Sequence, residues 1–315
     1  MNQKPIIIFG LPRSGTTWLA KTLEQADGIQ YIVEPDNEGT TFLGYYYKRG
    51  LERFPYFRIG EDPKSYLKLF SRALQGDYIT KDCPSNNVLF KSNLISLYLV
   101  KKRLERKERN RKLVLNWDFL LKKNIEFNPN KRRLVKTVHG LLNIPFLKNN
   151  FDFFPLIILR HPASSIHSHL KLNISDADQD VYKNEKLRKD FLAPFLSEMD
   201  KIKTPLSYMG MQFGIFHYII SFYVKQYNYK VILHEELCGN PLEEFKKLYK
   251  SLDLKWEINV EEFISKNNTN GQGGFDIKRI ASEEKDNWKT KWTKEEIAEI
   301  EKGYLIFPNE FYDFK

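Results

Sequence analysis

Short runs of apolar, largely β-branched residues recur along the chain, and segments with helical patterns separate them. Several runs are apolar at successive positions, which is typical of a strand buried on both faces. The predicted strands are Pro5–Phe9, Gln30–Val33, Leu134–Thr137, Pro155–Leu159 and Lys230–Leu233. The predicted helices are Thr17–Gln25, Ser164–Leu172, Met211–Tyr227 and Leu242–Ser251. This alternation predicts an α/β fold with a doubly wound, mainly parallel sheet.

The chain has 315 residues and contains no Pro/Gly/Ser-rich linker, so we expect a single domain over residues 1–315. Two long segments, about 40–130 and 172–210, interrupt the strand–helix alternation as helical insertions. We expect them to lie over the carboxyl edge of the sheet, where folds of this class bind ligands. Any choice between ligands should therefore depend on these two segments.

The chain is basic, with 50 Lys and Arg against 40 Asp and Glu, a formal net charge of +10. Much of the excess lies in Lys101–Lys112 (KKRLERKERNRK), which indicates either a solvated helix or a docking surface for an anionic partner. The remaining excess is spread out and suits a small anionic ligand. The chain has no repeat of aromatic and basic residues, so we do not expect nucleic-acid binding.

The amino-terminal segment does not resemble a secretory signal, because its apolar run covers only Pro5–Phe9 and leads into a glycine loop. No stretch of about 18 apolar residues predicts a transmembrane anchor, although peripheral contact with a membrane stays open. Cys83 and Cys238 fit no disulfide framework, so we expect a cytoplasmic protein. His161, His167 and His169 lack the neighbouring Cys or carboxylate of a tetrahedral site, and we expect no metal.

A glycine loop joins the first predicted strand to the first predicted helix. Such a loop directs backbone N–H groups and the positive end of a helix at an anion, usually a phosphate. Gly10 and Gly15 have the spacing of a Walker A loop, but Thr16 stands where that motif requires lysine. Arg13, inside the loop, supplies a cation instead.

The segment Pro12–Trp18 (PRSGTTW) resembles the 5′-phosphosulfate loop of sulfotransferases that use 3′-phosphoadenosine-5′-phosphosulfate (PAPS). The resemblance implies a P-loop-type fold, PAPS as donor and 3′,5′-ADP as product. It also implies no metal, because the donor has no triphosphate for Mg²⁺ to bridge. An arginine at position 13, in the loop, resembles the carbohydrate and tyrosylprotein branches of the family. A tryptophan at position 18 resembles the small-molecule branch, where this residue stacks on adenine. The resemblance implies these donor-binding residues: Arg13, Ser14, Gly15, Thr16, Thr17 and Trp18. Trp18 also fits a core aromatic residue at the start of a helix.

A second motif follows the fourth predicted strand, in Leu156–Pro162 (LIILRHP). Arg160 at the strand end and Ser168 about two turns along the next helix can converge on one phosphate. In the sulfotransferase family the corresponding pair binds the 3′-phosphate. Further along, Glu235 lies in a segment (VILHEEL) that resembles a structural strand and turn of the family.

Two residues are candidates for the base that takes the proton of the acceptor. Glu34 follows the second predicted strand and resembles the glutamate base of the tyrosylprotein and carbohydrate branches. His139 resembles the histidine of the small-molecule branch, with one residue inserted before it. Lys136, at the end of the third predicted strand, can stabilise charge on the bridging oxygen. The catalytic candidates are therefore Glu34, His139, Lys136 and Arg13, and we expect Glu34 rather than His139 to be the base, because His139 is displaced by one residue from the pattern that it resembles.

The carboxyl-terminal region contains a stretch, Lys278–Thr293, that resembles the lid which folds over the nucleotide in the family. The resemblance implies Arg279 as a further 3′-phosphate ligand, although the glycine pair of the family pattern is missing.

The sequence thus predicts transfer of a sulfuryl group from PAPS to a hydroxyl or amine, with a glycan hydroxyl as the first candidate acceptor. Two alternatives are a P-loop kinase acting on a small molecule and a non-catalytic module that binds a polyanion. The sequence does not indicate an oligomeric state.

Overall fold

The structure is a computed structural model that describes residues 3–38, 41, 44, 47–75, 128–172, 181–269 and 286–314. Its centre is a five-stranded sheet in the order β2-β3-β1-β4-β5, and every neighbouring pair in it is parallel. The strands are β1 (Ile6–Phe9), β2 (Ile29–Val33), β3 (Arg132–Thr137), β4 (Phe154–Leu159) and β5 (Val231–Leu233). The predicted α/β fold is confirmed, and each predicted strand overlaps one of these.

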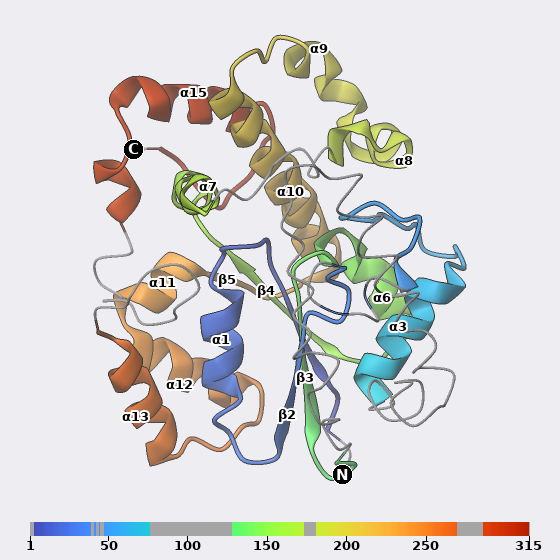
Figure 1. Ribbon diagram of the computed structural model, residues 1–315, viewed down its shortest axis with the longest axis vertical. Coiled ribbons are helices and arrows are strands. Elements are labelled where there is room, and N and C mark those ends of the chain that lie inside the picture. Colours follow the sequence, from blue (N-terminus) through green and yellow to red (C-terminus); the bar gives the residue numbers. More distant parts are fainter. Residues whose placement is uncertain are drawn as a thin grey trace, which may run out of the picture.

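Helices cover both faces of the sheet (Figure 1). The helices are α1 (Thr16–Leu23), α3 (Lys64–Gln75), α6 (Ile144–Asn150), α7 (Pro162–Lys171), α8 (Glu185–Leu187), α9 (Leu196–Met199), α10 (Pro205–Tyr227), α11 (His234–Gly239), α12 (Pro241–Ser251), α13 (Ile258–Asn267) and α15 (Lys294–Tyr304). Short 3₁₀ turns lie at Leu141–Asn143, Val181–Lys183, Ala193–Phe195 and Asn287–Thr290, and a π-helical turn lies at Arg188–Leu192. Within this described part of the chain, no helix is both long and apolar enough to span a bilayer.

The longest helix, α10, begins six residues before the predicted start at Met211. The physical reason is its amino-terminal cap: the side chain of Thr204 accepts a hydrogen bond from the Ser207 N–H, and Pro205 occupies the first turn. The helix ends at Asn228, whose backbone is left-handed with φ 52°. The second predicted insertion, about 172–210, therefore includes the first turns of α10.

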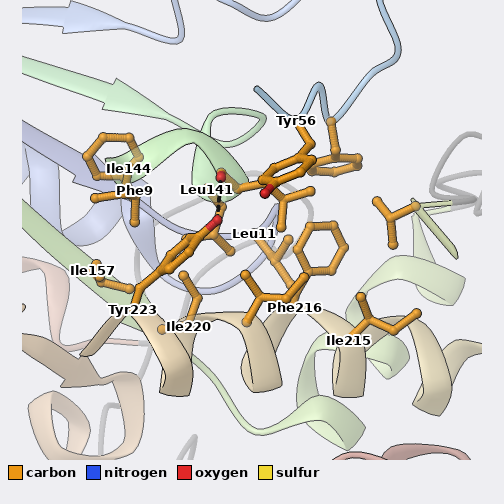
Figure 2. Packing of buried hydrophobic residues seen from close by; sticks show 14 of the residues in the cluster. Phe9, Leu11, Tyr56, Leu141, Ile144, Ile157, Ile215, Phe216, Ile220 and Tyr223 are labelled. Atoms are coloured by element: carbon orange, nitrogen blue, oxygen red, sulfur yellow. Dashed lines mark hydrogen bonds between the residues drawn. The ribbon is translucent and has the colours of Figure 1, made fainter. Parts of the chain in front are cut away.

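The two faces of β1 belong to two different clusters of buried side chains, because successive residues of a strand point to opposite faces. Ile6 and Ile8 pack with residues of α1, α12 and α13. Ile7 and Phe9 pack on the other face with residues of α3, α6, α7 and α10; part of this second cluster is drawn in Figure 2. These side chains are fully buried, which confirms that β1 is covered on both sides.

The order of the strands reverses at β1, which lies between β3 and β4. From β1 the chain passes to β2 on one side, returns through β3, and then continues to β4 and β5 on the other side. Ligands of doubly wound sheets bind outside the carboxyl ends of the strands at such a switch point. The carboxyl ends of β1, β3 and β4 carry the candidate residues Arg13, Lys136 and Arg160.

Candidate active site

The loop between β1 and α1 is a tight turn that leads directly into a helix. The Ser14 hydroxyl donates a hydrogen bond to the Leu11 carbonyl at 2.7 Å, which closes the turn. Arg13 and Gly15 both have left-handed backbones, with φ 69° and 90°. A Cβ at Gly10 would lie 2.6 Å from the Ser14 hydroxyl and 2.8 Å from a β4 carbonyl, so only glycine fits. The first N–H groups of α1, which have no partner within the helix, follow directly.

The segment after β4 contacts this loop at three points. The Arg13 Nε donates to the Ser168 hydroxyl at 2.9 Å, and the Arg160 Nη1 donates to the Arg13 carbonyl at 3.2 Å. The His169 Nε2 lies 3.0 Å from the Pro12 carbonyl, to which it donates. The structure therefore brings together Arg13, Arg160 and Ser168, which the sequence placed at the two ends of the donor.

Lys136 at the end of β3 links the loop to Glu34. Its side chain is 4% exposed, and its Nζ lies 2.5 Å from a Glu34 carboxylate oxygen. The same Nζ donates to the Thr17 hydroxyl at 3.0 Å. The Asn37 amide donates to the other Glu34 oxygen at 2.5 Å. Burial raises the pKa of Glu34, but the charge and hydrogen bond of Lys136 and the bond from Asn37 outweigh it, so the pKa lies below its ordinary value.

The backbone of Glu34 is also held in an unusual conformation. Its φ is 42°, in the left-handed region that costs a non-glycine residue about 1–3 kcal/mol. The Glu34 N–H donates to the Lys136 carbonyl at 2.7 Å, and its carbonyl accepts from the Asn37 N–H at 3.0 Å. Strained residues of this kind concentrate at functional sites, which makes Glu34 a stronger candidate than its sequence context alone indicated.

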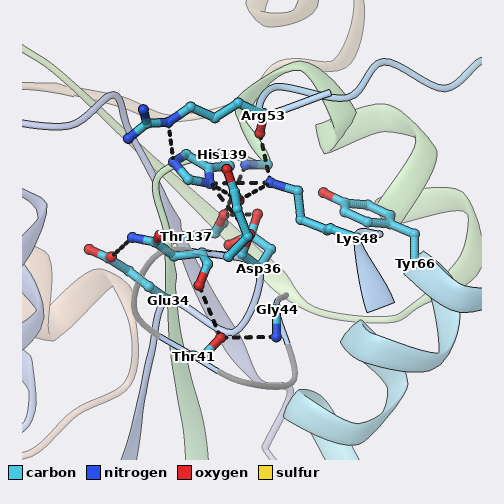
Figure 3. A network of polar contacts seen from close by, with 12 residues as sticks. Glu34, Asp36, Thr41, Gly44, Lys48, Arg53, Tyr66, Thr137 and His139 are labelled. Atoms are coloured by element: carbon cyan, nitrogen blue, oxygen red, sulfur yellow. Dashed lines mark hydrogen bonds and ion pairs between the residues drawn. The ribbon is translucent and has the colours of Figure 1, made fainter. Parts of the chain in front are cut away.

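His139 lies in a buried network of charged side chains (Figure 3). Its side chain is fully buried, and the Arg53 Nε donates to its Nε2 at 3.1 Å. Its Nδ1 lies 3.2 Å from a Glu38 carboxylate oxygen and 3.2 Å from the Lys48 ammonium. The Lys48 ammonium donates to that same Glu38 oxygen at 2.7 Å and to the Arg53 carbonyl at 2.8 Å. Both ring nitrogens of His139 are thus engaged inside the protein.

Burial raises the pKa of Glu38, but its hydrogen bond to His139 and the charges of His139 and Lys48 outweigh burial and hold that pKa well below its ordinary value. Asp36 is fully buried, and its Oδ2 accepts from the Thr137 hydroxyl at 2.6 Å. Burial raises the pKa of Asp36 despite the nearby charges of Lys48 and His139.

The turn after β2 therefore runs beside the end of β3 as a ladder of three contacts. Glu34 pairs with Lys136, Asp36 with Thr137, and Glu38 with His139. The sequence reasoning missed the network residues Asp36, Glu38, Lys48 and Arg53. The signal that could have found the first two is the alternation of acidic residues at 34, 36 and 38 directly after a strand.

Trp18 lies in the first turns of α1, partly exposed, with its ring edge-to-face against Phe245 at a centroid distance of 5.2 Å. The packing against the core is confirmed, and stacking on adenine stays a prediction. Arg279 and the basic run Lys101–Lys112 lie outside the described residues. Among the residues that are described, no group of three or more His, Cys, Asp or Glu side chains is arranged to hold a metal.

The chain matches a family model described as "Sulfotransferase family" over residues 5–258. The solved structure of the sulfotransferase domain from the curacin biosynthetic pathway is 16% identical, with a TM-score of 0.45, and the match covers 98% of this chain and 99% of that one. The sulfotransferase domain of the Synechococcus PCC 7002 olefin synthase is 15% identical, with a TM-score of 0.46 and coverages of 95% and 94%. A sulfotransferase from Alicyclobacillus acidocaldarius is 14% identical, with a TM-score of 0.37 and coverages of 94% and 99%. No curated protein gives a significant match.

Proposed function

This chain belongs to the sulfotransferase family, and from this premise we propose that it transfers a sulfuryl group from PAPS to a hydroxyl or amine of an acceptor. The observation that carries the choice of donor is the meeting of Arg13, Arg160 and Ser168 at the carboxyl ends of β1 and β4. PAPS carries anionic groups at both its 5′ and 3′ positions. Two guanidinium groups and a hydroxyl joined in one cluster suit such a ligand.

The loop supports the same donor. The tight turn at Gly10 leaves room only for backbone, and the amides of Gly15, Thr16 and Thr17 begin α1. Together with Arg13 they form the cradle for the 5′-phosphosulfate. The kinase alternative lacks support, because the Walker lysine is replaced by Thr16, whose side chain is buried.

The reaction forms a bond between the acceptor oxygen or nitrogen and sulfur, and breaks the bond between sulfur and the bridging oxygen of the phosphate. The products are the sulfated acceptor and 3′,5′-ADP, and the proton of the acceptor passes to a base of the protein. Lys136, between Thr17 and Glu34, lies where a cation can stabilise the departing phosphate.

We favour Glu34 over His139 as that base. The Glu34 side chain is 15% exposed beside the loop, whereas the His139 ring is fully buried and its Nε2 is occupied by Arg53. A base must come within hydrogen-bond reach of the proton that it abstracts. The partial exposure of Glu34 beside the loop supports it in this role, whereas His139 would first have to leave a buried network.

The acceptor that we propose first is a carbohydrate hydroxyl, because Arg13 and Glu34 resemble the carbohydrate and tyrosylprotein branches. This choice rests on family analogy. Incubation with labelled PAPS and a panel of saccharides, phenols and lipids tests it, and exclusive sulfation of phenols would refute it.

The donor is tested by calorimetry in the absence of Mg²⁺. We expect the protein to bind 3′,5′-ADP at least tenfold more tightly than 5′-AMP, since each hydrogen bond to a charged group contributes about 1.5–3 kcal/mol. Equal affinity for the two nucleotides, or turnover of ATP with Mg²⁺, would contradict the proposal.

A further inference from the structure

The carboxyl-terminal residues of the chain pack against the turn that carries Arg160, and Figure 1 shows this end of the chain close to α7. The connection is a partly buried carboxyl group, that of Glu235 at the start of α11. One of its oxygens accepts from the His161 backbone N–H at 3.0 Å. The other accepts from the Tyr312 hydroxyl at 2.7 Å. A single side chain thus joins the turn after β4 to the end of the chain.

The ring of His161 is held by the same carboxyl-terminal region. It stacks on Trp288 with the centroids 4.1 Å apart and the planes 8° from parallel, and Phe314 contacts it edge-on at 4.8 Å. Burial lowers the pKa of His161 to about 4, so the ring is neutral near pH 7. Its Nε2 then donates to the Asp313 carbonyl at 2.9 Å. Backbone and ring of His161 are both fixed by partners from other parts of the chain.

Arg160 is the residue immediately before His161, and its Nη1 reaches the donor loop at the Arg13 carbonyl. The Arg160 charge also acts on Glu235: it lowers the pKa of that carboxyl, against the larger, raising effect of burial. The Tyr312 hydroxyl occupies the second carboxyl oxygen and keeps it turned toward the carboxyl terminus.

We propose that the carboxyl-terminal tail, through Tyr312 and Glu235, is a positioning element of the donor site that keeps Arg160 directed at the 3′-phosphate. The proposal rests on the proposed function, in which Arg160 binds that phosphate. Tyr312 donates to Glu235, and it acts through Glu235 on the His161 backbone. Its loss should therefore weaken recognition of one phosphate and leave the rest of the nucleotide site unchanged.

The test is the variant Tyr312→Phe, which removes one hydroxyl and keeps the ring. Calorimetry with both nucleotides gives, for each protein, the dissociation constant of 5′-AMP divided by that of 3′,5′-ADP; a high ratio means a strong preference for 3′,5′-ADP. We expect 3′,5′-ADP to bind about tenfold more weakly, which is about 1.4 kcal/mol, and 5′-AMP to bind as in the wild type. The ratio is insensitive to a partly unfolded sample, because unfolding removes sites for both nucleotides equally.

A matched control is Tyr223→Phe, since the Tyr223 hydroxyl is also buried and donates one hydrogen bond, to the Leu142 carbonyl at 3.0 Å. This control should leave the ratio unchanged. If Tyr312→Phe does not fold, Phe314→Leu loosens the packing on the His161 ring and should lower the ratio in the same way. If Tyr312→Phe keeps the same preference for 3′,5′-ADP as the wild type, the proposed role of the tail is wrong, but the proposed function stands. Absence of that preference in the wild type would refute the proposed function itself.

Discussion

Replacement of Glu34 by glutamine separates the chemical role of this side chain from its structural role. The amide has the shape of the carboxylate but cannot take a proton from the acceptor. Removal of a general base costs about 10²–10⁴ in rate, or about 2.7–5.4 kcal/mol of activation free energy. The glutamine oxygen can accept from Lys136 or from Asn37 but not from both, so one bond to Glu34 is lost. We expect that loss to lower the free energy of unfolding by about 1–3 kcal/mol.

A domain of ordinary stability, about 5–15 kcal/mol, tolerates that loss and stays folded. The assay measures kcat and KM with labelled PAPS, and calorimetry measures the affinity for 3′,5′-ADP. For Glu34→Gln we expect most of kcat to be lost at nearly wild-type nucleotide affinity, because Arg13, Arg160 and Ser168 are unchanged.

The pH dependence of kcat/KM is an independent test of Glu34 as the base. Burial raises the pKa of Glu34 but Lys136 outweighs it, and the resulting pKa lies below the ordinary value of 4.5. The carboxylate is therefore already ionised at neutral pH, so kcat/KM of the wild type should show no acid limb until the pH falls below that value. An acid limb near neutral pH would refute Glu34 as the base.

Glu38→Gln is the matched control, since it makes the same chemical change in the same turn but faces His139 and Lys48. It should lower stability and leave most of kcat. His139→Ala should likewise lower the unfolding midpoint and cost much less in kcat than Glu34→Gln. The reverse order of the two kcat losses would show that the histidine is the base and that our reasoning from burial is wrong.

Three further predictions concern the donor site and the network beneath it. Arg160→Ala should lower the affinity for 3′,5′-ADP by tenfold to several hundredfold and leave the affinity for 5′-AMP unchanged, as measured by calorimetry. Equal losses of affinity for the two nucleotides would contradict the assignment of Arg160 to the 3′-phosphate. Lys48→Met should cost about 2–3 kcal/mol in urea unfolding at pH 7, less than for a fully buried pair because Glu38 is one-third exposed. The folded-state pKa of Glu38 is lowered, so the pairing stabilises the fold fully above the unfolded-state pKa and progressively less as the pH falls toward the folded-state pKa. The cost of Lys48→Met should shrink over the same range, and a cost independent of pH would contradict the pairing. Gly15→Ala should lower the melting temperature and the affinity for 3′,5′-ADP, since φ is 90° and a Cβ would lie 2.4 Å from the His234 ring; wild-type values of both would refute the steric argument.

The fold was predictable from the sequence because its strands are buried on both faces and so are apolar at successive positions. Ile6, Ile7 and Ile8 show the principle: they alternate between two cores, yet all three are apolar. The boundaries were less predictable. The start of α10 depends on Thr204 and Pro205, which lie before the apolar periodicity begins.

The tight loop between β1 and α1 was predictable because its signals are local, with glycines, a cation and a helix start within nine residues. The burial of His139 was not, because Lys48 and Arg53 enclose it from about ninety positions away along the chain. No local pattern marks either of them as a partner. The position of Glu34 after the second strand and the residue inserted before His139 favoured Glu34 from the sequence alone, and the tertiary contacts add the burial of His139 as a second argument for the same order.

The network around His139 also explains how Glu34 keeps its strained backbone. A left-handed residue persists only where its surroundings over-determine it. Here the Glu34 N–H donates to the Lys136 carbonyl. Further along the turn, the Asp36 carboxylate accepts from the Thr137 hydroxyl. The Glu38 carboxylate contacts both His139 and Lys48. Relaxation of φ at Glu34 would pull these buried groups away from their partners, at about 1–3 kcal/mol for each unsatisfied group. That cost equals or exceeds the strain, so the carboxylate stays fixed beside Lys136 and the donor loop. The buried histidine thus contributes to the site by holding the turn that carries the glutamate.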